Sequence, residues 1–210
     1  MQCIDAGQPG VADKKMKLSP DILLNGYCAG VFPMASPELG NVIRWYAPDP
    51  RAILPLENMH VSKSLRRTIR QGKFEIEYDR RFEEVMRRCA QPRADDSGCW
   101  ISEEIIEAYL GLFKFGFAHS VECVADGELV GGLYGVSIGG AFFGESMFHS
   151  RTDASKVALY HLVERLKSGG YALLDVQYIT DHLASLGVVE IARSDYERVL
   201  KNALSLGAKW

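Results

Sequence analysis

The sequence predicts an α+β fold in which a domain built on a mixed α/β sheet follows a small N-terminal module. Helical periodicity dominates residues 62–115, and strand periodicity with tight glycine turns follows up to residue 145. A helix, a buried strand and a last helix come after them. Helices and strands that are grouped in this way are typical of α+β domains.

The composition is that of an ordinary globular protein. With 210 residues, of which 47% are hydrophobic and 24% charged, the chain can bury one good core, or one core with a small satellite. No apolar run approaches the ~20 residues that span a bilayer, and residues 1–17 lack the apolar stretch of a secretory signal. We therefore expect a cytoplasmic protein without a membrane partner. The net charge of -3 argues against nonspecific coating of nucleic acid, but it is compatible with a local basic patch.

The cysteines and histidines give no sign of a metal site or a disulfide framework. The five cysteines are odd in number and include no CxxC pair, and the histidines show no metal-binding spacing such as HExxH. We expect reduced, mostly buried thiols, and neither a metal nor another cofactor. The cysteines are Cys3, Cys28, Cys89, Cys99 and Cys123.

Residues 1–60 are expected to form a small, loop-rich module with a flexible tail. The tail, residues 1–17, is polar and lacks periodicity. Ser19-Pro20-Asp21 then supplies an N-cap, an N1 proline and a first-turn acid, which predict a short helix through Tyr27. The prolines of residues 32–55 argue against a long helix or a central strand in that stretch.

Three amphipathic helices are predicted next. Ser62 can cap the first, which runs to about Gln71, and the second covers Asp79–Cys89. A polar loop over residues 91–98 leads to the third helix, Ser102–Phe115.

A meander of three strands follows these helices. The strands are His119–Val124, Leu129–Ile138 and Ala141–Glu145, with turns at Asp126-Gly127 and Gly139-Gly140.

A helix, a strand and a helix complete the domain. Asp153 can cap the first helix, which should end at Gly169-Gly170. Tyr171–Tyr178 is predicted to be a buried strand, and Ser194 with Glu197 forms a capping box for the last helix.

Polar side chains interrupt two apolar runs of this domain. Asp175 and Gln177 alternate with apolar residues, so both side chains point to the same face of a strand. Glu145 stands among large apolar residues. Buried polar groups need partners, and a substrate is one candidate. Two such places suggest an active cleft. The alternatives are a buried structural hydrogen-bond pair at Asp175 and Gln177, and a satisfied structural ion pair at Glu145.

Nine motifs, spread over about residues 20–200, carry a resemblance to a known family. The motifs are Gly30–Met34 (GVFPM), Trp45–Arg51 (WYAPDPR), Leu65-Arg66-Arg67, Ala118–Glu122 (AHSVE), Leu129–Gly135 (LVGGLYG), Gly144–Phe148 (GESMF), Ala154-Ser155-Lys156, Asp175-Val176-Gln177 and Ala184–Gly187 (ASLG). Through them the chain resembles the bacterial leucyl/phenylalanyl-tRNA-protein transferases.

The resemblance implies a fold, a reaction and partners. The fold is an acyltransferase domain over residues 61–210 that is related to the N-acetyltransferases (GNAT-like). The reaction transfers Leu or Phe from aminoacyl-tRNA to the N-terminal Lys or Arg of an acceptor protein, which marks that protein for N-degron degradation. Positioning should dominate catalysis, because the ester is already activated and an α-amino group with a pKa of about 7.7–8.0 is partly neutral at pH 7.

The resemblance also implies roles for the three polar residues. Gln177 would contact the attacking amine, while Asp175 would orient that amine and favour the departure of its proton. Glu145 would lie in the aminoacyl and acceptor site, where its charge could meet a basic N-terminal residue.

Further residues would bind the aminoacyl-adenosine end of the tRNA. The alternatives for them are ordinary core positions and structural aromatic residues. Leu133, Phe142, Gly144 and Met147 would form the pocket for the transferred side chain, and Trp45, Tyr46 and Trp100 could stack on the terminal adenine.

Two groups of residues would contact tRNA phosphates. The first group is a set of four cations on one broad helix face: Lys63, Arg66, Arg67 and Arg70. The alternative is that this helix face is simply solvated. Ser155 and Lys156 lie in the first turn of a helix, where a phosphate near the tRNA 3′ terminus could bind. The alternative there is a salt bridge from Lys156 to Asp153.

Two other functions stay open. An acyl-CoA-dependent N-acetyltransferase would need a glycine-rich pyrophosphate loop before its helix, and His149–Ser155 contains no glycine. A non-catalytic RNA-binding module would leave the buried Asp175 and Gln177 unexplained.

Overall fold

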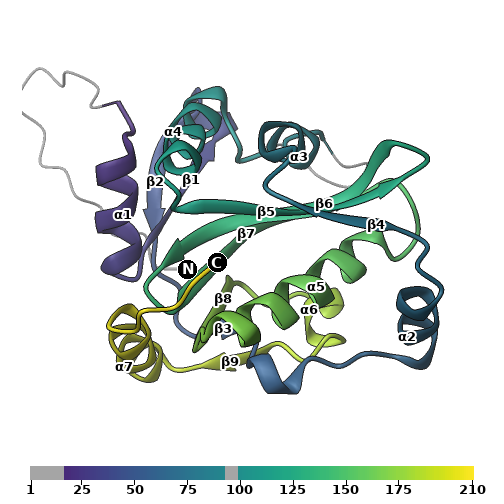
Figure 1. Ribbon diagram of the computed structural model, residues 1–210. Coiled ribbons are helices and arrows are strands. Elements are labelled where there is room, and N and C mark those ends of the chain that lie inside the picture. Colours follow the sequence, from purple (N-terminus) through teal and green to yellow (C-terminus); the bar gives the residue numbers. More distant parts are fainter. Residues whose placement is uncertain (1–16, 93–98) are drawn as a thin grey trace, which may run out of the picture.

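A seven-stranded mixed sheet forms the centre of the fold, and helices cover both of its faces (Figure 1). The computed structural model describes residues 17–92 and 99–210. The α+β prediction is confirmed. In spatial order the strands are β4 (Glu75–Tyr78), β5 (Ala118–Ala125), β6 (Glu128–Ile138), β7 (Ala141–His149), β8 (Leu173–Gln177), β3 (Arg51–Ile53) and β9 (Val189–Ile191).

The predicted meander is confirmed as β5, β6 and β7. Asp126 and Gly127 both have positive φ at the first turn, and Gly139 has φ 57° at the second, which are conformations that tight hairpin turns require. β7 continues beyond the expected end at Glu145 and reaches His149. Because of this extension, β7 reaches beyond the residues that pair with the neighbouring strand β8.

The neighbouring strands β7 and β8 form the parallel pair of the sheet. Their register pairs Ala141 with Leu173 and ends at Phe143 with Asp175. α5 (Ala154–Gly169) connects the two strands, as a crossover between parallel strands requires. Beyond Phe143, β7 has no partner in β8, so the two strands part on that side of the sheet.

Two cores lie on opposite faces of the sheet. One contains α1 (Pro20–Cys28), α3 (Phe82–Cys89) and α4 (Glu103–Lys114), and the other contains α5. Neighbouring strand residues alternate between the cores, as the period of two predicts, so Tyr134 and Phe143 lie in the first core. Leu133 and Phe142 lie in the second core.

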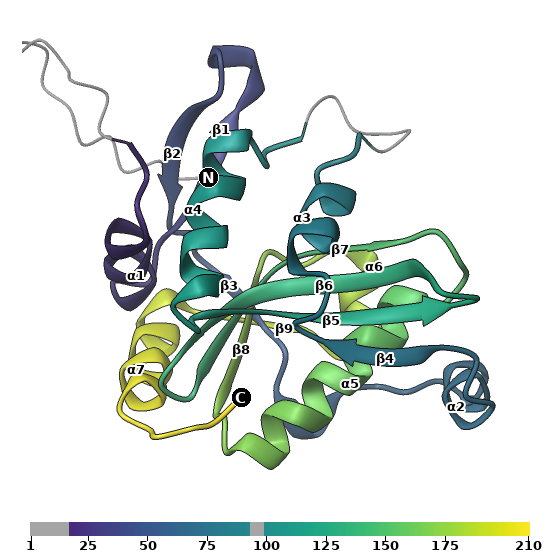
Figure 2. The same ribbon diagram turned by 45° about the horizontal axis from the view of Figure 1, so that its top comes forward.

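The proline-rich stretch contains strands that the sequence did not predict. β1 (Phe32–Ser36) and β2 (Val42–Tyr46) form a separate hairpin, which rises beside α1 and α4 in Figure 2. β3 lies between β8 and β9, so the prediction that this stretch holds no central strand is wrong. The reason is length: β3 has three residues, which fit between Pro50 and Pro55 without placing a proline in the ladder.

Two of the predicted helix caps, Ser19 and Ser62, are confirmed, and Ser102 is a third cap that was not predicted. The hydroxyl groups of these serines accept hydrogen bonds from backbone N–H groups three residues later. These caps begin α1, α2 (Lys63–Arg70) and α4.

Two other predicted caps are wrong. Asp153 precedes α5 with φ 68° and makes no cap hydrogen bond, because its carboxylate contacts Thr68 and Lys156 instead. α7 (Arg193–Leu204) begins after Ala192 without a capping box, and Glu197 accepts from Arg193 at 2.8 Å.

Several elements and boundaries differ from those that the sequence predicts. The second amphipathic helix begins at Phe82 rather than at Asp79, whose carboxylate accepts from the Ser120 backbone N–H. The strands β4 and β9 and the short helix α6 (Asp181–Ala184) were not predicted. The predicted tail and most of the predicted loop at 91–98 lie outside the described residues. In the described part of the chain, no helix has the length and apolar character needed to span a membrane.

Candidate active site

A cavity of about 250 Å³ opens where β7 and β8 part. Its walls are mainly apolar, and Glu145 is the charged residue among the described residues that line it. A cavity of this kind suits a small apolar group that is oriented by a few polar contacts. Its apolar lining includes Leu133, Met147, Leu159, Leu162, Leu174 and Val176.

Glu145 occupies a β-bulge. The register between β6 and β7 pairs Tyr134 with Ser146 and then Gly135 with Gly144, so Glu145 is the extra residue. A bulge re-aims a side chain that regular alternation would send elsewhere. Here it turns a carboxylate that is only 8% exposed toward the end of β8.

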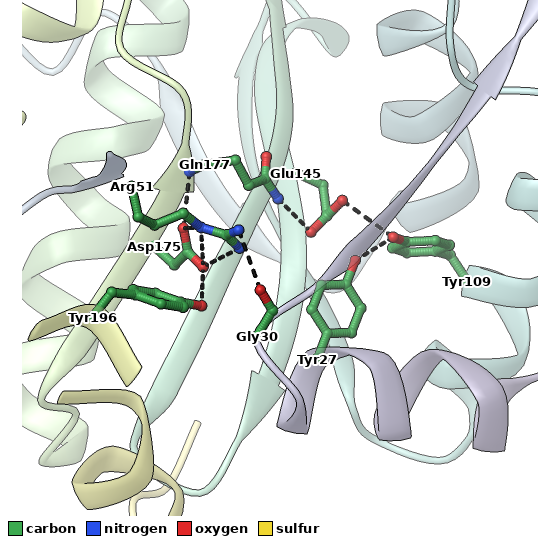
Figure 3. Close-up of polar contacts among 8 residues, drawn as sticks. All are labelled: Tyr27, Gly30, Arg51, Tyr109, Glu145, Asp175, Gln177 and Tyr196. Carbon is green, nitrogen blue, oxygen red and sulfur yellow. Dashed lines mark hydrogen bonds and ion pairs between the residues drawn. The ribbon is translucent and has the colours of Figure 1, made fainter. Parts of the chain in front are cut away.

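The Glu145 carboxylate receives hydrogen bonds from both sides (Figure 3). Gln177 Nε2 donates to Oε1 at 2.9 Å, and the Tyr109 hydroxyl donates to Oε2 at 3.1 Å. Tyr109 in turn shares a short hydrogen bond with Tyr27 of α1. Burial raises the pKa of Glu145 to about 7, although the hydroxyl groups of Tyr27 and Tyr109 act in the opposite direction. This carboxyl group therefore changes charge near neutral pH.

Gln177 ends β8 in an unusual backbone conformation. Its φ is 66°, which is uncommon for a residue other than glycine, and its side chain is only 7% exposed. Because Nε2 donates to Glu145, the amide oxygen points away from that contact. The side chain therefore has a fixed orientation with an acceptor atom still available.

Asp175 is completely buried in a polar cluster. Its carboxylate accepts from Arg51 Nη2 at 2.8 Å and from the Tyr196 hydroxyl at 2.7 Å. It also accepts the backbone N–H of Gln177 at 2.9 Å. Asp175 is thus an anchor that holds Gln177 in place (Figure 3).

Arg51 is the counter-charge of Asp175, and the sequence alone did not identify it. It is 1% exposed, and its guanidinium lies 4.6 Å from the ring centre of Phe32 and 4.7 Å from that of Tyr196. Arg51 Nη1 also donates to Gly30 O at 3.4 Å. The one available signal was that a buried Asp175 needs a counter-charge. No local pattern says which of the 24 Lys and Arg residues supplies it.

The structure brings some of the predicted substrate-binding residues to the cavity and leaves others away from it. Leu133, Gly144, Met147 and Trp100 line it. Phe142 stacks on Trp210 in the core that contains α5, with 5.4 Å between ring centres. Trp45 packs against the core that contains α1, α3 and α4, close to Gly26 of α1. Tyr46 packs against the same core.

A second cavity of about 450 Å³ adjoins the first and shares Met147 and Gln91 with it. Ser155 is buried there, and 3.3 Å separates its Oγ from His149 Nδ1. Lys156 lies beside it and pairs with Asp153 at 3.4 Å. Burial lowers the pKa of His182, and the nearby charge of Lys156 lowers it further. The cavity is lined by Arg88, Phe148, His149, Ser150, Ser155 and His182, among others.

The four predicted cations of α2 are solvent-exposed, and within the described residues none of them makes an ion pair. α2 is attached to the start of α5 by the contact between Thr68 Oγ1 and Asp153 Oδ2 at 3.3 Å. These cations are Lys63, Arg66, Arg67 and Arg70.

No group of three His, Cys, Asp or Glu side chains in the described ranges could hold a metal ion. The absence of a cofactor stays a prediction.

The fold and the site define an enzyme-like α+β protein. Its apolar cavity, the adjoining cavity lined by Arg88 and Ser155, and the oriented amide of Gln177 are the parts that a group-transfer site needs.

Comparisons with known proteins agree with this class. The family model described as leucyl/phenylalanyl-tRNA protein transferase matches residues 53–201, and that of the N-terminal domain of the same family matches residues 16–49. The chain therefore belongs to the leucyl/phenylalanyl-tRNA protein transferase family.

Two relatives that carry this name cover nearly the whole chain. The protein from Paramagnetospirillum magneticum is 54% identical over 90% of this chain and 90% of its own. The protein from Gloeobacter violaceus is 55% identical over 92% of this chain and 97% of its own. The resemblance to the family is thus confirmed.

Two solved structures show a weaker likeness. L-PGS from Bacillus licheniformis has a TM-score of 0.43 and 15% identity, and the match covers 73% of this chain and 56% of that one. The C-terminal domain of a putative lysylphosphatidylglycerol synthetase from Agrobacterium fabrum has a TM-score of 0.40 and 13% identity, with 90% and 60% covered.

Proposed function

We propose that this chain is an aminoacyltransferase that moves Leu or Phe from aminoacyl-tRNA to the N-terminus of an acceptor protein. The observation that carries the proposal is the apolar cavity at the parting of β7 and β8, with the Glu145–Gln177 pair beside it. The acceptor amine attacks the ester carbonyl, the peptide bond forms, and the 3′-terminal hydroxyl of the tRNA leaves with a proton.

Gln177 positions the attacking amine. Its Nε2 is held by Glu145, so its amide oxygen is left to accept a hydrogen bond from the amine. Such an oriented acceptor lowers the entropy cost of attack, which is the main requirement for an ester that is already activated.

Asp175 acts as a positioning residue in this scheme. Its hydrogen bonds to Arg51, Tyr196 and the Gln177 backbone fix the end of β8. Loss of Asp175 would therefore reduce transfer through Gln177, without removing a contact to the amine itself.

Glu145 supports a preference for acceptors that begin with Lys or Arg. Its carboxylate lies in the lining of the cavity and is partly charged near pH 7. A basic side chain next to the attacking amine would offset the cost of keeping this buried carboxylate charged. The products would carry an N-terminal Leu or Phe, which fits a role in N-degron degradation.

The helix α2 and the second cavity support tRNA binding. The cations on α2 make no ion pair with other described residues, which suits phosphates, and Ser155 in the first turn of α5 lines the second cavity. Lys156 pairs with Asp153, so it contributes to a phosphate site only if that pair opens or is shared.

We also propose the finer features of the fold and location. A parallel strand pair that parts beside the site and is joined by α5 supports kinship with the GNAT-like fold. The separate β1–β2 hairpin supports an N-terminal module within residues 1–60, although β3 belongs to the large sheet. Dependence on charged tRNA supports a cytoplasmic location.

The reaction is tested with labelled Leu and Phe on charged tRNA and two peptides that begin with Arg or with Asp. We expect label on the Arg peptide alone, and free labelled amino acid should give none. Label on the Asp peptide would refute the acceptor preference, and label on neither would refute the proposed function.

A further inference from the structure

Two cysteines share the wall of the active-site cavity. Cys89, the last residue of α3, and Cys99 both line it, beside Trp100 and Tyr134. Both are thiols in this structure. The Cys99 thiol donates to the main-chain oxygen of Cys89, with 3.9 Å between Sγ and O. The Cys99 sulfur therefore lies against the residue that it must reach to form a disulfide.

Tyr134 lies in the same cavity wall as the two cysteines. Its buried hydroxyl lacks a hydrogen-bond partner among the described residues, and Tyr134 lines the same cavity. Burial raises the pKa of Tyr134 well above its ordinary value, and negative charge on Cys89 or Cys99 would raise it further. Cys89, Cys99 and the hydroxyl group of Tyr134 thus belong to one wall of the cavity, where the Cys99 sulfur already contacts Cys89.

We propose that Cys89 and Cys99 form a reversible disulfide that shuts off the aminoacyl cavity. The proposal rests on the proposed function for its effect on transfer, but the disulfide itself does not depend on it. Cysteines of cytosolic proteins are normally kept reduced, so a disulfide there is typically transient and redox-sensing.

The oxidant is a low-molecular-weight disulfide. The thiolate of Cys99, which is more exposed than Cys89, attacks it and releases one small thiol. The thiolate of Cys89 then displaces the second small thiol and closes the Cys89–Cys99 bond. The protein loses two electrons and two protons, and the small disulfide is reduced to two thiols.

The bond would distort the cavity because Trp100 follows Cys99 directly and lines the same wall. Drawing the Cys99 sulfur toward Cys89 Sγ replaces its present contacts with Cys89 O and Ile101 N. A displacement of about 1 Å near reacting groups can cost about a hundredfold in rate.

The test treats the reduced full chain with oxidised glutathione and measures two quantities. Intact mass and peptide mapping should show the loss of two hydrogen atoms and a link between the peptides that contain Cys89 and Cys99. Transfer of labelled Phe to the Arg peptide should fall at least about tenfold and return on addition of dithiothreitol.

Cysteine variants test whether the Cys89–Cys99 pair causes the loss of transfer on oxidation. Each variant is compared with its own untreated sample. Cys99→Ser, at a partly exposed position, should lose the sensitivity to oxidation, and Cys89→Ser should agree if it folds. Cys28→Ser is the control, because Cys28 is exposed at the end of α1, and it should stay sensitive.

Three results would overturn the proposal: no Cys89–Cys99 link after oxidation, a link that leaves the rate unchanged, or inactivation that persists in Cys99→Ser. A chain that forms the link but shows no transfer even when reduced would instead contradict the proposed function.

Discussion

Arg51 and Asp175 form a fully buried ion pair that joins β3 to β8, with 2.8 Å between Arg51 Nη2 and Asp175 Oδ2. The pair ties the N-terminal part of the chain to the strand that ends in Gln177. Burying two charges is costly, so the pair holds only because every oxygen of Asp175 is hydrogen-bonded. Its evident role is to fix the end of β8.

Removing one charge of this pair should be strongly destabilising. Arg51→Met leaves Asp175 buried without its counter-charge, and we expect the free energy of unfolding to fall by about 3–5 kcal/mol. Urea denaturation measures this. Arg151→Ala, which breaks an exposed pair with Asp126, should cost less than about 1 kcal/mol. Equal losses in the two variants would contradict the structural role of Arg51.

Glu145 should make stability depend on pH. The folded-state pKa is about 7, above the ordinary value of 4.5, so between these values the folded chain binds the proton that the unfolded chain has lost. The free energy of unfolding should therefore fall as pH rises through this range, by on the order of 1–3 kcal/mol from this group. Glu145→Gln should flatten the slope measured from pH 5 to 8. An unchanged slope would mean that Glu145 is charged throughout.

Gly135 should be required for the bulge at Glu145. A Cβ there would lie 2.3 Å from the Phe143 carbonyl oxygen, whereas a Cβ at Gly144 would be 3.5 Å from the nearest atom, the Asp175 carbonyl oxygen. We expect Gly135→Ala to destabilise the fold by about 1–3 kcal/mol, because the strands must shift. Gly144→Ala should unfold in urea close to wild type. The reverse order would contradict the close approach at Gly135.

The cations of α2 should set the salt dependence of tRNA binding. In Arg66→Glu with Arg67→Glu, the slope of log affinity against log salt should shrink by about two, because two phosphate contacts are lost. Lys201→Glu is a suitable control, because it lies on α7 at the far side of the fold from α2 (Figure 1). Equal effects of the α2 and α7 changes would point to net charge alone.

Long periodic elements and local polar signals could be predicted from the sequence. β5, β6 and β8 and the serine caps follow from patterns within a few residues of one another. β4 and β9 have four and three residues, too few to show a period. The sequence could not identify Arg51 as the partner of Asp175, because the two residues are 124 positions apart in the chain. The bulge at Glu145 depends on the register in which β7 pairs with β6, and this register cannot be read from the sequence of β7 alone.

The most direct test of the proposed site is the single-turnover rate of Phe transfer to the Arg peptide in Gln177→Ala. We predict a fall of about a hundredfold or more with tRNA affinity unchanged, because the positioned acceptor for the amine is lost. Asn202→Ala, which removes an exposed amide from α7, should keep the wild-type rate. A wild-type rate in a folded Gln177→Ala would contradict the role of Gln177 and, with it, the account of the site.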